Sequence, residues 1–268
     1  ENHLKKVLVT GASGYIASHC IKVLLEKGFK VKGSVRDLNK INLVKNFLGN
    51  SLYKGNFEFC ELNLLSDKGW NEALKDCDYL MHIASPCKIK EPKMETEITV
   101  PAVEGTLRAL HAAKISKIKK VVLTSSIGAM LYGNENKICE TSDWTDISKY
   151  VGSYIKSKTM AEKAAWNFFN DLSNPSFALT IINPGMVFGP VINGNLEGVS
   201  QNMILNLIRG KYPFLPDIYF SVVDVRDVAL IHVEALFKKE SDNQRLILTS
   251  EKSISFLEIS RTLNKIGF

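Results

Sequence analysis

The feature that most constrains the fold is a regular alternation of short apolar runs with longer helix-forming segments over the first 185 residues. The apolar runs are KKVLVT, FKVKGSV, FEFCEL, DYLMHIA, KKVVLTSS and FALTII. Such runs are typical of parallel strands that are buried on both faces, and the intervening helices supply the two covering layers. The sequence therefore predicts an α/β fold with a doubly wound, mostly parallel sheet.

A glycine-rich turn follows the first of these runs directly. The segment VLVTGASGYIASHC places Gly11, Gly14 and Ala17 three residues apart at the opening of the first helix. Glycines permit a tight turn and a close approach to a pyrophosphate, whose charge the helix N-terminus favours. A purely structural turn also uses glycine, but strand, turn and helix together predict a dinucleotide-binding Rossmann sheet. The residues expected to line the cofactor here are Gly11, Ser13, Gly14, Tyr15 and Ile16.

The composition changes after residue 185. The segment NPGMVFGPVINGNLEG is rich in glycine, proline and asparagine, and a helical pattern follows near residues 197–210. The segment FSVVDVRDVALIHVEALF then reads again as strand, loop and helix. We expect a Rossmann domain of residues 1–183 and 220–250 and a small C-terminal substrate lobe of residues 184–219 and 251–268. Because the chain ends directly after a helix-like stretch, we expect this lobe to be incomplete.

The end of the second run discriminates between NAD and NADP. In Rossmann proteins an acidic residue there bonds the ribose 2′-OH of NAD, whereas an arginine accepts the 2′-phosphate of NADP. Here Val35 takes the position of the acid and Arg36 follows, with Lys40 as a second positive charge. Asp37 could itself be an NAD-type acid. We favour NADPH/NADP as the cofactor.

The ends of the third and fourth runs are expected to line the same cofactor. Asn63 and Leu64 follow the third run, where an adenine could be held, and Ala84 and Ser85 follow the fourth, above the nicotinamide. Ligands of doubly wound sheets bind at the carboxyl ends of the strands. Each pair could equally be an ordinary strand exit.

The segment YIKSK predicts a proton donor. On a helix, side chains four apart share a face and side chains two apart do not, so Lys158 lies with Tyr154 and Lys156 does not. Hydride transfer to a carbonyl leaves charge on oxygen that needs a proton. A free phenol has a pKa of about 10, and a neighbouring cation favours its ionised form.

A third group comes from the fifth run, which ends in Ser125 and Ser126. Neighbouring side chains of a strand point to opposite faces, so only one of the two hydroxyls is expected to face the cleft. Each feature is common when taken singly. Their order along the chain, with the glycine turn first, the serine next and the Tyr154–Lys158 pair last, predicts catalysis.

These motifs resemble the extended short-chain dehydrogenase/reductase family. Within that family they resemble the group of dihydroflavonol reductases, cinnamoyl-CoA reductases and NADPH-dependent aldehyde or methylglyoxal reductases. The matching segments cover essentially the whole chain and are VTGASGYIASH, GSVRD, HIASP, PAVEGTLRAL, VVLTSS, YIKSK, INPGMVFGP and VVDVRDVA. The resemblance implies a Rossmann-fold, NADP-dependent oxidoreductase that acts on carbonyl groups.

The resemblance also implies roles for individual residues. It makes Ser126 the catalytic serine, with Tyr154 and Lys158 as its partners, and Arg36 the contact to the 2′-phosphate. Further residues expected at the cofactor are Ser125, Asn183, Pro184, Gly185 and Val187.

Two positions depart from the family pattern. Asn63 stands where an aspartate commonly contacts the adenine, which keeps an acceptor but loses a charge. Ala102 stands where many short-chain reductases have an asparagine, which leaves proton relay to water or to the ribose.

Substrate selection is expected from a mostly apolar set of residues, any of which could instead be core. The principal candidates are Pro86, Met130 and Met186. The further candidates are Cys87, Ile89, Leu131, Ile192, Met203 and Phe220. This set favours an uncharged or aromatic carbonyl compound as the small-molecule substrate.

Composition limits the alternatives. The formal charge of +6 comes from scattered lysines with no basic run, which argues against nucleic-acid binding. Five cysteines without a C-x-x-C pair argue against a disulfide framework, and we expect no metal. No apolar run reaches the roughly 18 residues of a membrane span, so we expect a cytoplasmic monomer or homodimer without membrane contact.

Three functions remain open from the residues. The first is an NADPH-dependent reductase of aldehydes or ketones. The second is an NAD-dependent sugar-nucleotide epimerase or dehydratase, which would require an acidic residue where Val35 and Arg36 stand. The third is a non-catalytic NADP-sensing regulator, which would need no tyrosine–lysine pair.

Overall fold

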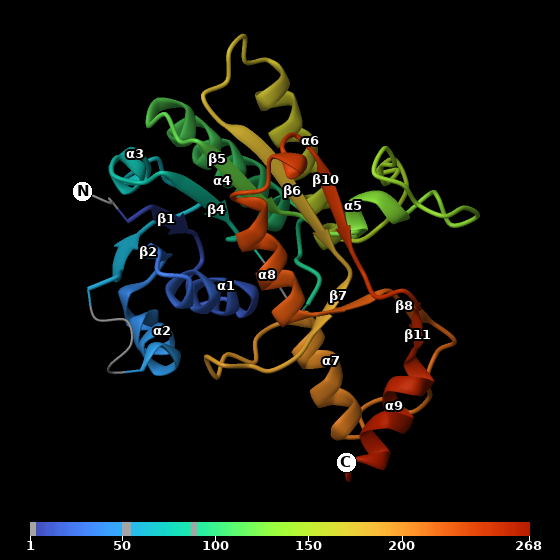
Figure 1. Cartoon of the computed structure of the whole chain (residues 1–268). Coiled ribbons are helices and arrows are strands. Elements are labelled where there is room, and N and C mark those ends of the chain that lie inside the picture. Colours follow the sequence, from blue (N-terminus) through green and yellow to red (C-terminus); the bar gives the residue numbers. More distant parts are fainter. Residues whose placement is uncertain (1–3, 50–54, 87–89) are drawn as a thin grey trace.

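The computed structural model of the chain describes residues 4–49, 55–86 and 90–268, and its centre is a seven-stranded sheet (Figure 1). The strand order is β10-β6-β5-β4-β1-β2-β3, and every neighbouring pair is parallel. The strands are β1 (Lys6–Val9), β2 (Lys30–Val35), β3 (Phe57–Glu61), β4 (Tyr79–His82), β5 (Lys120–Thr124), β6 (Ala178–Pro184) and β10 (Arg245–Leu248). The six predicted runs form β1 to β6, and the predicted doubly wound parallel sheet is confirmed.

Helices cover both faces of this sheet (Figure 1). One layer contains α1 (Tyr15–Glu26), α2 (Ile41–Leu48) and α8 (Val225–Ala235). The other contains α3 (Trp70–Leu74), α4 (Thr96–Ile115) and α6 (Ser153–Asn170). Successive side chains of a strand point alternately to the two helical layers. In β5, Val122 packs against the layer of α1 and α8, whereas Val121 and Leu123 pack against the layer of α4 and α6.

The remaining elements are short or lie beyond the carboxyl ends of the central strands. They are η1 (Leu38–Lys40), α5 (Gly128–Leu131), β7 (Met186–Phe188), α7 (Val199–Ile208), β8 (Tyr219–Phe220), β9 (Val222–Asp224), η2 (Lys239–Ser241), β11 (Ile254–Ser255) and α9 (Phe256–Lys265). Strand β7 pairs with β9 and β8 pairs with β11.

A separate apolar cluster joins α7 and α9, which lie together near the C-terminal end (Figure 1). Its buried members are Met203, Phe256 and Ile259, and Met186 and Phe220 pack against them. At the start of α9, Ser255 and Glu258 form a capping box that satisfies backbone donors at both positions. The boundaries of the two expected domains stay a prediction.

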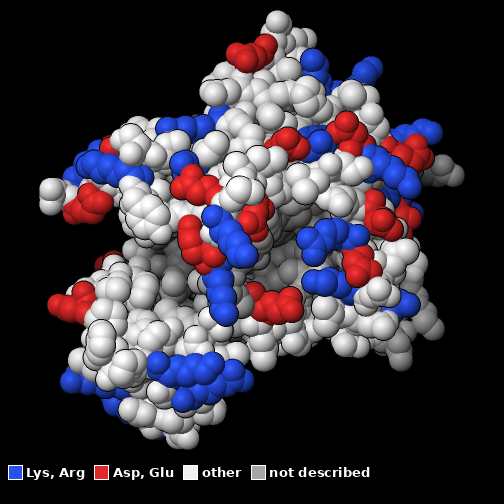
Figure 2. All heavy atoms as spheres, turned by 180° about the vertical axis from the view of Figure 1, so that it is seen from behind, with Lys and Arg blue, Asp and Glu red and all other residues white. Residues whose placement is uncertain are grey.

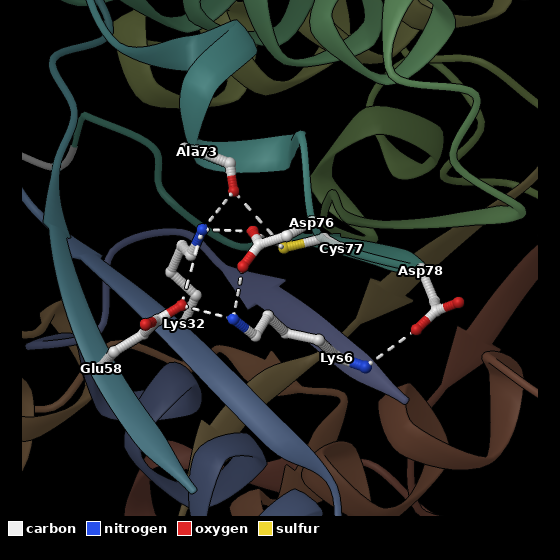
Figure 3. Close-up of polar contacts among 7 residues, drawn as sticks. All are labelled: Lys6, Lys32, Glu58, Ala73, Asp76, Cys77 and Asp78. Carbon is white, nitrogen blue, oxygen red and sulfur yellow. Dashed lines mark hydrogen bonds and ion pairs between the residues drawn. The ribbon is translucent and has the colours of Figure 1, made fainter. Parts of the chain in front are cut away.

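A charged cluster lies on the sheet face beside α3 (Figure 3). The Lys32 side chain is nearly buried, and its Nζ donates to Asp76 at 2.5 Å and to the Ala73 carbonyl at 3.0 Å. Lys6 Nζ donates to Asp76 and to Glu58, at 2.5 and 2.7 Å. Burial disfavours the ionised carboxylate of Asp76, but hydrogen bonds from Lys32 and Lys6 outweigh it and lower the pKa of Asp76 to about 2.

Removing the charge of Asp76 is therefore expected to destabilise the fold. Asp76→Asn removes the negative charge that pairs with the nearly buried Lys32 ammonium and should lower the free energy of unfolding by about 1–2 kcal/mol. The expected loss is this small because the Asp76 side chain is 51% exposed and solvent screens the ion pair. Urea unfolding at pH 7 measures this loss. The control is Asp67→Asn, because Asp67 is 90% exposed in its ion pair with Arg108. An equal loss in both variants would contradict the prediction.

The same carboxylate gives a pH dependence. Because the pKa of Asp76 is about 2 in the folded chain against an ordinary value of 3.8, its contribution is present above about pH 4 and is lost as pH falls toward 2. Asp76→Asn should therefore have a flatter stability profile than the unchanged chain over that interval.

Candidate active site

The predicted glycine turn lies against the exit of β4. Gly11 has φ +69°, and a Cβ atom there would lie 3.1 Å from the Ala84 Cα atom. Gly14 precedes α1. No side chain caps the N-terminus of this helix, and its first turn contains no acidic residue. Ala17 is completely buried against the sheet. The turn therefore offers a close-approach surface and an uncapped helix N-terminus, which fit a pyrophosphate.

A segment after β7 closes over this turn, and it was not anticipated from the sequence. Asn193 Nδ2 donates to the carbonyl oxygens of Ser13 and Gly14, at 2.9 and 3.3 Å. Asn195 Nδ2 donates to the same Ser13 oxygen at 3.2 Å. The only sequence signal was the asparagine-rich composition of this stretch, which also describes any loop.

Side chains of α1 hold the start of the same segment. The Tyr15 hydroxyl donates to the Gly189 carbonyl at 2.9 Å, and His19 Nε2 bonds the Pro190 carbonyl at 2.7 Å. Burial, with the nearby charge of Asp224, raises the pKa of Tyr15 to about 12. The Tyr15 hydroxyl is thus a stable donor to the segment, and its predicted cofactor contact stays a prediction.

The end of β2 carries the residues expected at the adenosine ribose. Val35 is buried, whereas the Arg36 side chain is exposed. The Asp37 carboxylate accepts from the Asn39 N–H at 2.9 Å and so caps η1. Lys40 Nζ lies 3.9 Å from a Glu197 oxygen. Asp37 has a local role, which weakens its interpretation as an NAD-type acid.

The exits of β3 and β4 differ in character. Asn63 Oδ1 accepts from the Leu65 N–H at 2.9 Å, a local turn that occupies part of its hydrogen-bonding capacity. Leu64 packs on α4 where Gly105 has no side chain to obstruct it. Ser85 and Ala84 are half-buried.

The tyrosine and the two lysines behave as their helical spacing predicts. Lys158 Nζ lies 5.9 Å from the centre of the Tyr154 ring, and the Lys158 residue is only 7% exposed. Lys156 points elsewhere, because its Nζ donates to Glu95 on α4's N-terminal side at 2.7 Å. The structure thus brings Tyr154 and Lys158 together and separates Lys156 from both.

The two serines at the end of β5 have different partners. Ser125 is buried, and its hydroxyl donates to Glu162 of α6 at 2.5 Å. Ser126 is half-buried, and its Oγ accepts from the Gly128 N–H at 3.0 Å. A Cβ on Gly128 would lie 3.2 Å from Ser126 Oγ and would collide with the side chain of Ile155. The Ser126 hydroxyl therefore lies beside the turn of α6 that carries Tyr154.

A buried histidine at the end of β4, His82, was also not predicted from the sequence. Thr10 Oγ1 accepts from the N–H groups of both Ile83 and Ala84 at 3.0 Å, so its hydroxyl proton is directed to His82 Nδ1, 2.9 Å away. Burial, together with the charge of Lys158, lowers the pKa of His82 to about 3. His82 is therefore neutral near pH 7.

The expected substrate residues fall into different environments. Met130 is 1% exposed, so its side chain belongs to the core and does not line a pocket in this structure. Pro86 and Met186 are half-buried. Cys87 and Ile89 lie outside the described residues. Of the other candidates, Met203 and Phe220 belong to the α7 and α9 cluster, Leu131 is exposed and Ile192 is half-buried.

A surface cavity of about 560 Å³ is separate from these residues. It lies along the C-terminal half of α6, and Trp144, Lys163 and Asn167 contribute to its wall. None of the predicted catalytic or cofactor residues lines it, so we do not identify it with the active site.

The charge on the surface is mixed. Figure 2 shows lysine and arginine side chains interspersed with acidic ones over the face opposite to the view of Figure 1. In residues 4–49, 55–86 and 90–268, no helix combines the length and the apolar character that a membrane crossing requires. Over the same described ranges, no three His, Cys, Asp or Glu side chains are grouped to hold a metal ion.

The sheet, the uncapped glycine turn and the Tyr154–Lys158 pair define a dinucleotide-binding oxidoreductase of the Rossmann class. Comparison with known families agrees: residues 7–248 match the NAD dependent epimerase/dehydratase family, and the chain belongs to it.

Two relatives and one solved structure that the chain resembles are named as reductases. A cinnamoyl-CoA reductase of Medicago truncatula is 34% identical over 270 residues, which cover 97% of this chain and 80% of the relative. A putative NADPH-dependent methylglyoxal reductase of Candida albicans is 37% identical, with 90% and 77% covered. The solved structure of yeast methylglyoxal/isovaleraldehyde reductase Gre2 complexed with NADPH superposes with a TM-score of 0.88 at 28% identity, covering 98% of this chain and 82% of that one.

The close approach at Gly11 gives a testable consequence. Gly11→Ala combines an unfavourable φ with a clash at Ala84 and should raise the dissociation constant of a nicotinamide dinucleotide by about tenfold or more. Gly28→Ala is the matched control, since Gly28 has φ +83° and a Cβ there would have no neighbour within 4 Å. Fluorescence titration of both variants measures the effect, and equal affinities would contradict the role of the turn.

Proposed function

We propose that this oxidoreductase uses NADPH to reduce the carbonyl group of an uncharged aldehyde or ketone, with Tyr154 as the proton donor. The observation that carries the proposal is the nearly buried Lys158 ammonium beside the Tyr154 ring, on a helix that also adjoins Ser126. A cation held next to a phenol, near a hydroxyl at a strand end, is the set of groups that carbonyl reduction requires.

The chemistry divides between the cofactor and the chain. Bound NADPH supplies the hydride. The Tyr154 hydroxyl donates its proton to the carbonyl oxygen as charge develops there, and the Ser126 hydroxyl donates a hydrogen bond to the same oxygen. The Lys158 ammonium then stabilises the phenolate that Tyr154 becomes.

The chain offers a matching cofactor site. The uncapped start of α1 favours the pyrophosphate, and Gly11 allows it to approach. The Arg36 and Lys40 side chains supply positive charge for the 2′-phosphate. The glycine, serine and proline residues at the strand ends complete the proposed contacts, with Ser85 and Pro184 on the nicotinamide side.

The family also contains epimerases, so the sugar-nucleotide alternative needs a physical argument. That alternative expects an acidic side chain at the end of β2, free to bond a ribose 2′-OH. Val35 occupies the strand end, and Asp37 lies two residues beyond it, where one of its carboxylate oxygens caps η1. Both observations favour the reductase, and the relatives named above are reductases too.

The mechanism is tested at Tyr154. We expect NADPH consumption with at least one carbonyl class in a panel of aldehydes, α-dicarbonyls, dihydroflavonols and acyl-CoAs. With the best substrate, Tyr154→Phe should lower kcat by roughly 10²–10⁴-fold and leave NADPH affinity nearly unchanged. Tyr150→Phe is the control, because Tyr150 is 84% exposed and lies just before α6. Full activity in Tyr154→Phe would refute the mechanism.

Cofactor choice is tested at Arg36. Arg36→Ala should weaken NADPH binding by about 10- to 100-fold and leave NADH binding unchanged, because only NADPH carries the 2′-phosphate. Arg209→Ala removes the same charge from the exposed end of α7 and should affect neither cofactor. Comparable losses for NADPH and NADH in Arg36→Ala would rule out the phosphate contact.

A further inference from the structure

A completely buried carboxylate shares the face of α6 that carries the proposed catalytic pair. Tyr154, Lys158 and Glu162 follow one another at intervals of four residues. Glu162 is 0% exposed, and burying an ionised carboxylate costs several kcal/mol unless charged and polar partners compensate. The partners of Glu162 therefore indicate why the chain keeps a charge there.

Four donors surround this carboxylate. Ser125 Oγ and Asn183 Nδ2 donate to one oxygen, at 2.5 and 2.8 Å. Arg245 Nε and Trp166 Nε1 donate to the other, at 2.5 and 3.3 Å. Ser125 follows β5, Asn183 belongs to β6 and Arg245 begins β10, so one side chain ties α6 to three adjacent strands.

The network reaches the proposed catalytic serine through the backbone. Asn183 Nδ2 also donates to the Ser126 carbonyl oxygen at 3.1 Å. Glu162 thus holds the Ser125 side chain directly and the Ser126 backbone through Asn183. Because Glu162 binds the Ser125 hydroxyl, we assign the hydrogen bond to the substrate oxygen to Ser126.

Arg245 extends the network to the loop before α6. Its Nη1 donates to the carbonyl oxygens of Thr141 and Asp143, at 2.8 and 2.6 Å. Its guanidinium carbon lies 4.0 Å from the centre of the Trp144 ring. The chain that leads into Tyr154 is therefore anchored to the same ion pair.

We propose that Glu162, paired with Arg245, is a positioning residue that fixes the Ser126 hydroxyl relative to the Tyr154 hydroxyl. The proposal rests on the function proposed above. Two helical turns separate Glu162 from Tyr154, roughly 12 Å along the axis, so Glu162 acts through Ser125 and Asn183 and does not touch the reacting atoms.

Two double variants test the role without leaving a buried charge unpaired. Glu162→Met with Arg245→Met replaces the pair by apolar side chains of similar volume, which buried ion pairs often tolerate. Glu162→Gln with Arg245→Met keeps an acceptor for Ser125 and Asn183. The first double variant should lose kcat by about 10- to 100-fold with NADPH affinity within about twofold, and the second should recover most of that loss.

The outcomes separate a positioning role from a purely structural one. Thermal unfolding and NADPH titration establish that both double variants are folded, and kcat is compared between them. Equal kcat values in the two, at any level, would overturn the proposal, because the acceptor at position 162 would then be irrelevant. Parallel assays of Ser126→Ala and Tyr154→Phe distinguish a failure of the positioning role from a failure of the proposed function. If those two variants stay active, the proposed function itself is wrong.

Discussion

Parallel pairing of seven strands is the constraint on which the rest of this molecule depends. All carboxyl ends of the sheet meet at one edge, so groups that are far apart in sequence come together there. The glycine turn after β1, the serines after β5 and Asn183 in β6 all lie at that edge. The helices add the remaining groups, because a helix that connects two parallel strands begins near the carboxyl edge of the sheet, as α6 does with Tyr154 in its first turn.

The sheet could be predicted from the sequence because its strands are continuous apolar runs, a pattern that only burial on both faces explains. The face shared by Tyr154 and Lys158 was equally predictable, since a helix of about 3.6 residues per turn places residues four apart on one face and Lys156 on another. The NADP preference came from Val35 at the position of the acid and from the positive charges of Arg36 and Lys40. The role of the neighbouring Asp37 as a helix cap became visible only in the structure.

Other features could not be predicted, because they depend on contacts across long separations. The strand pattern did not distinguish Ser125 from Ser126, and only the family resemblance favoured Ser126. In the structure the Ser125 hydroxyl donates to Glu162, 37 residues away. Asn193 reaches the glycine turn across about 180 residues of sequence. Met130 looked like a flexible pocket residue, yet α5 places it in the core. Glu162 could have been predicted to lie on the same helix face, because it continues the four-residue interval of Tyr154 and Lys158.

The last residues of β5 are bonded to both helical layers at once. Thr124 donates to Nε2 of the buried His232 on α8 at 2.7 Å, while Ser125 donates to Glu162 on α6. Local opening at this strand end would have to break buried hydrogen bonds on both sides of the sheet in a single event. The strand end that carries the proposed catalytic serine is thus tied to both helical layers of the core.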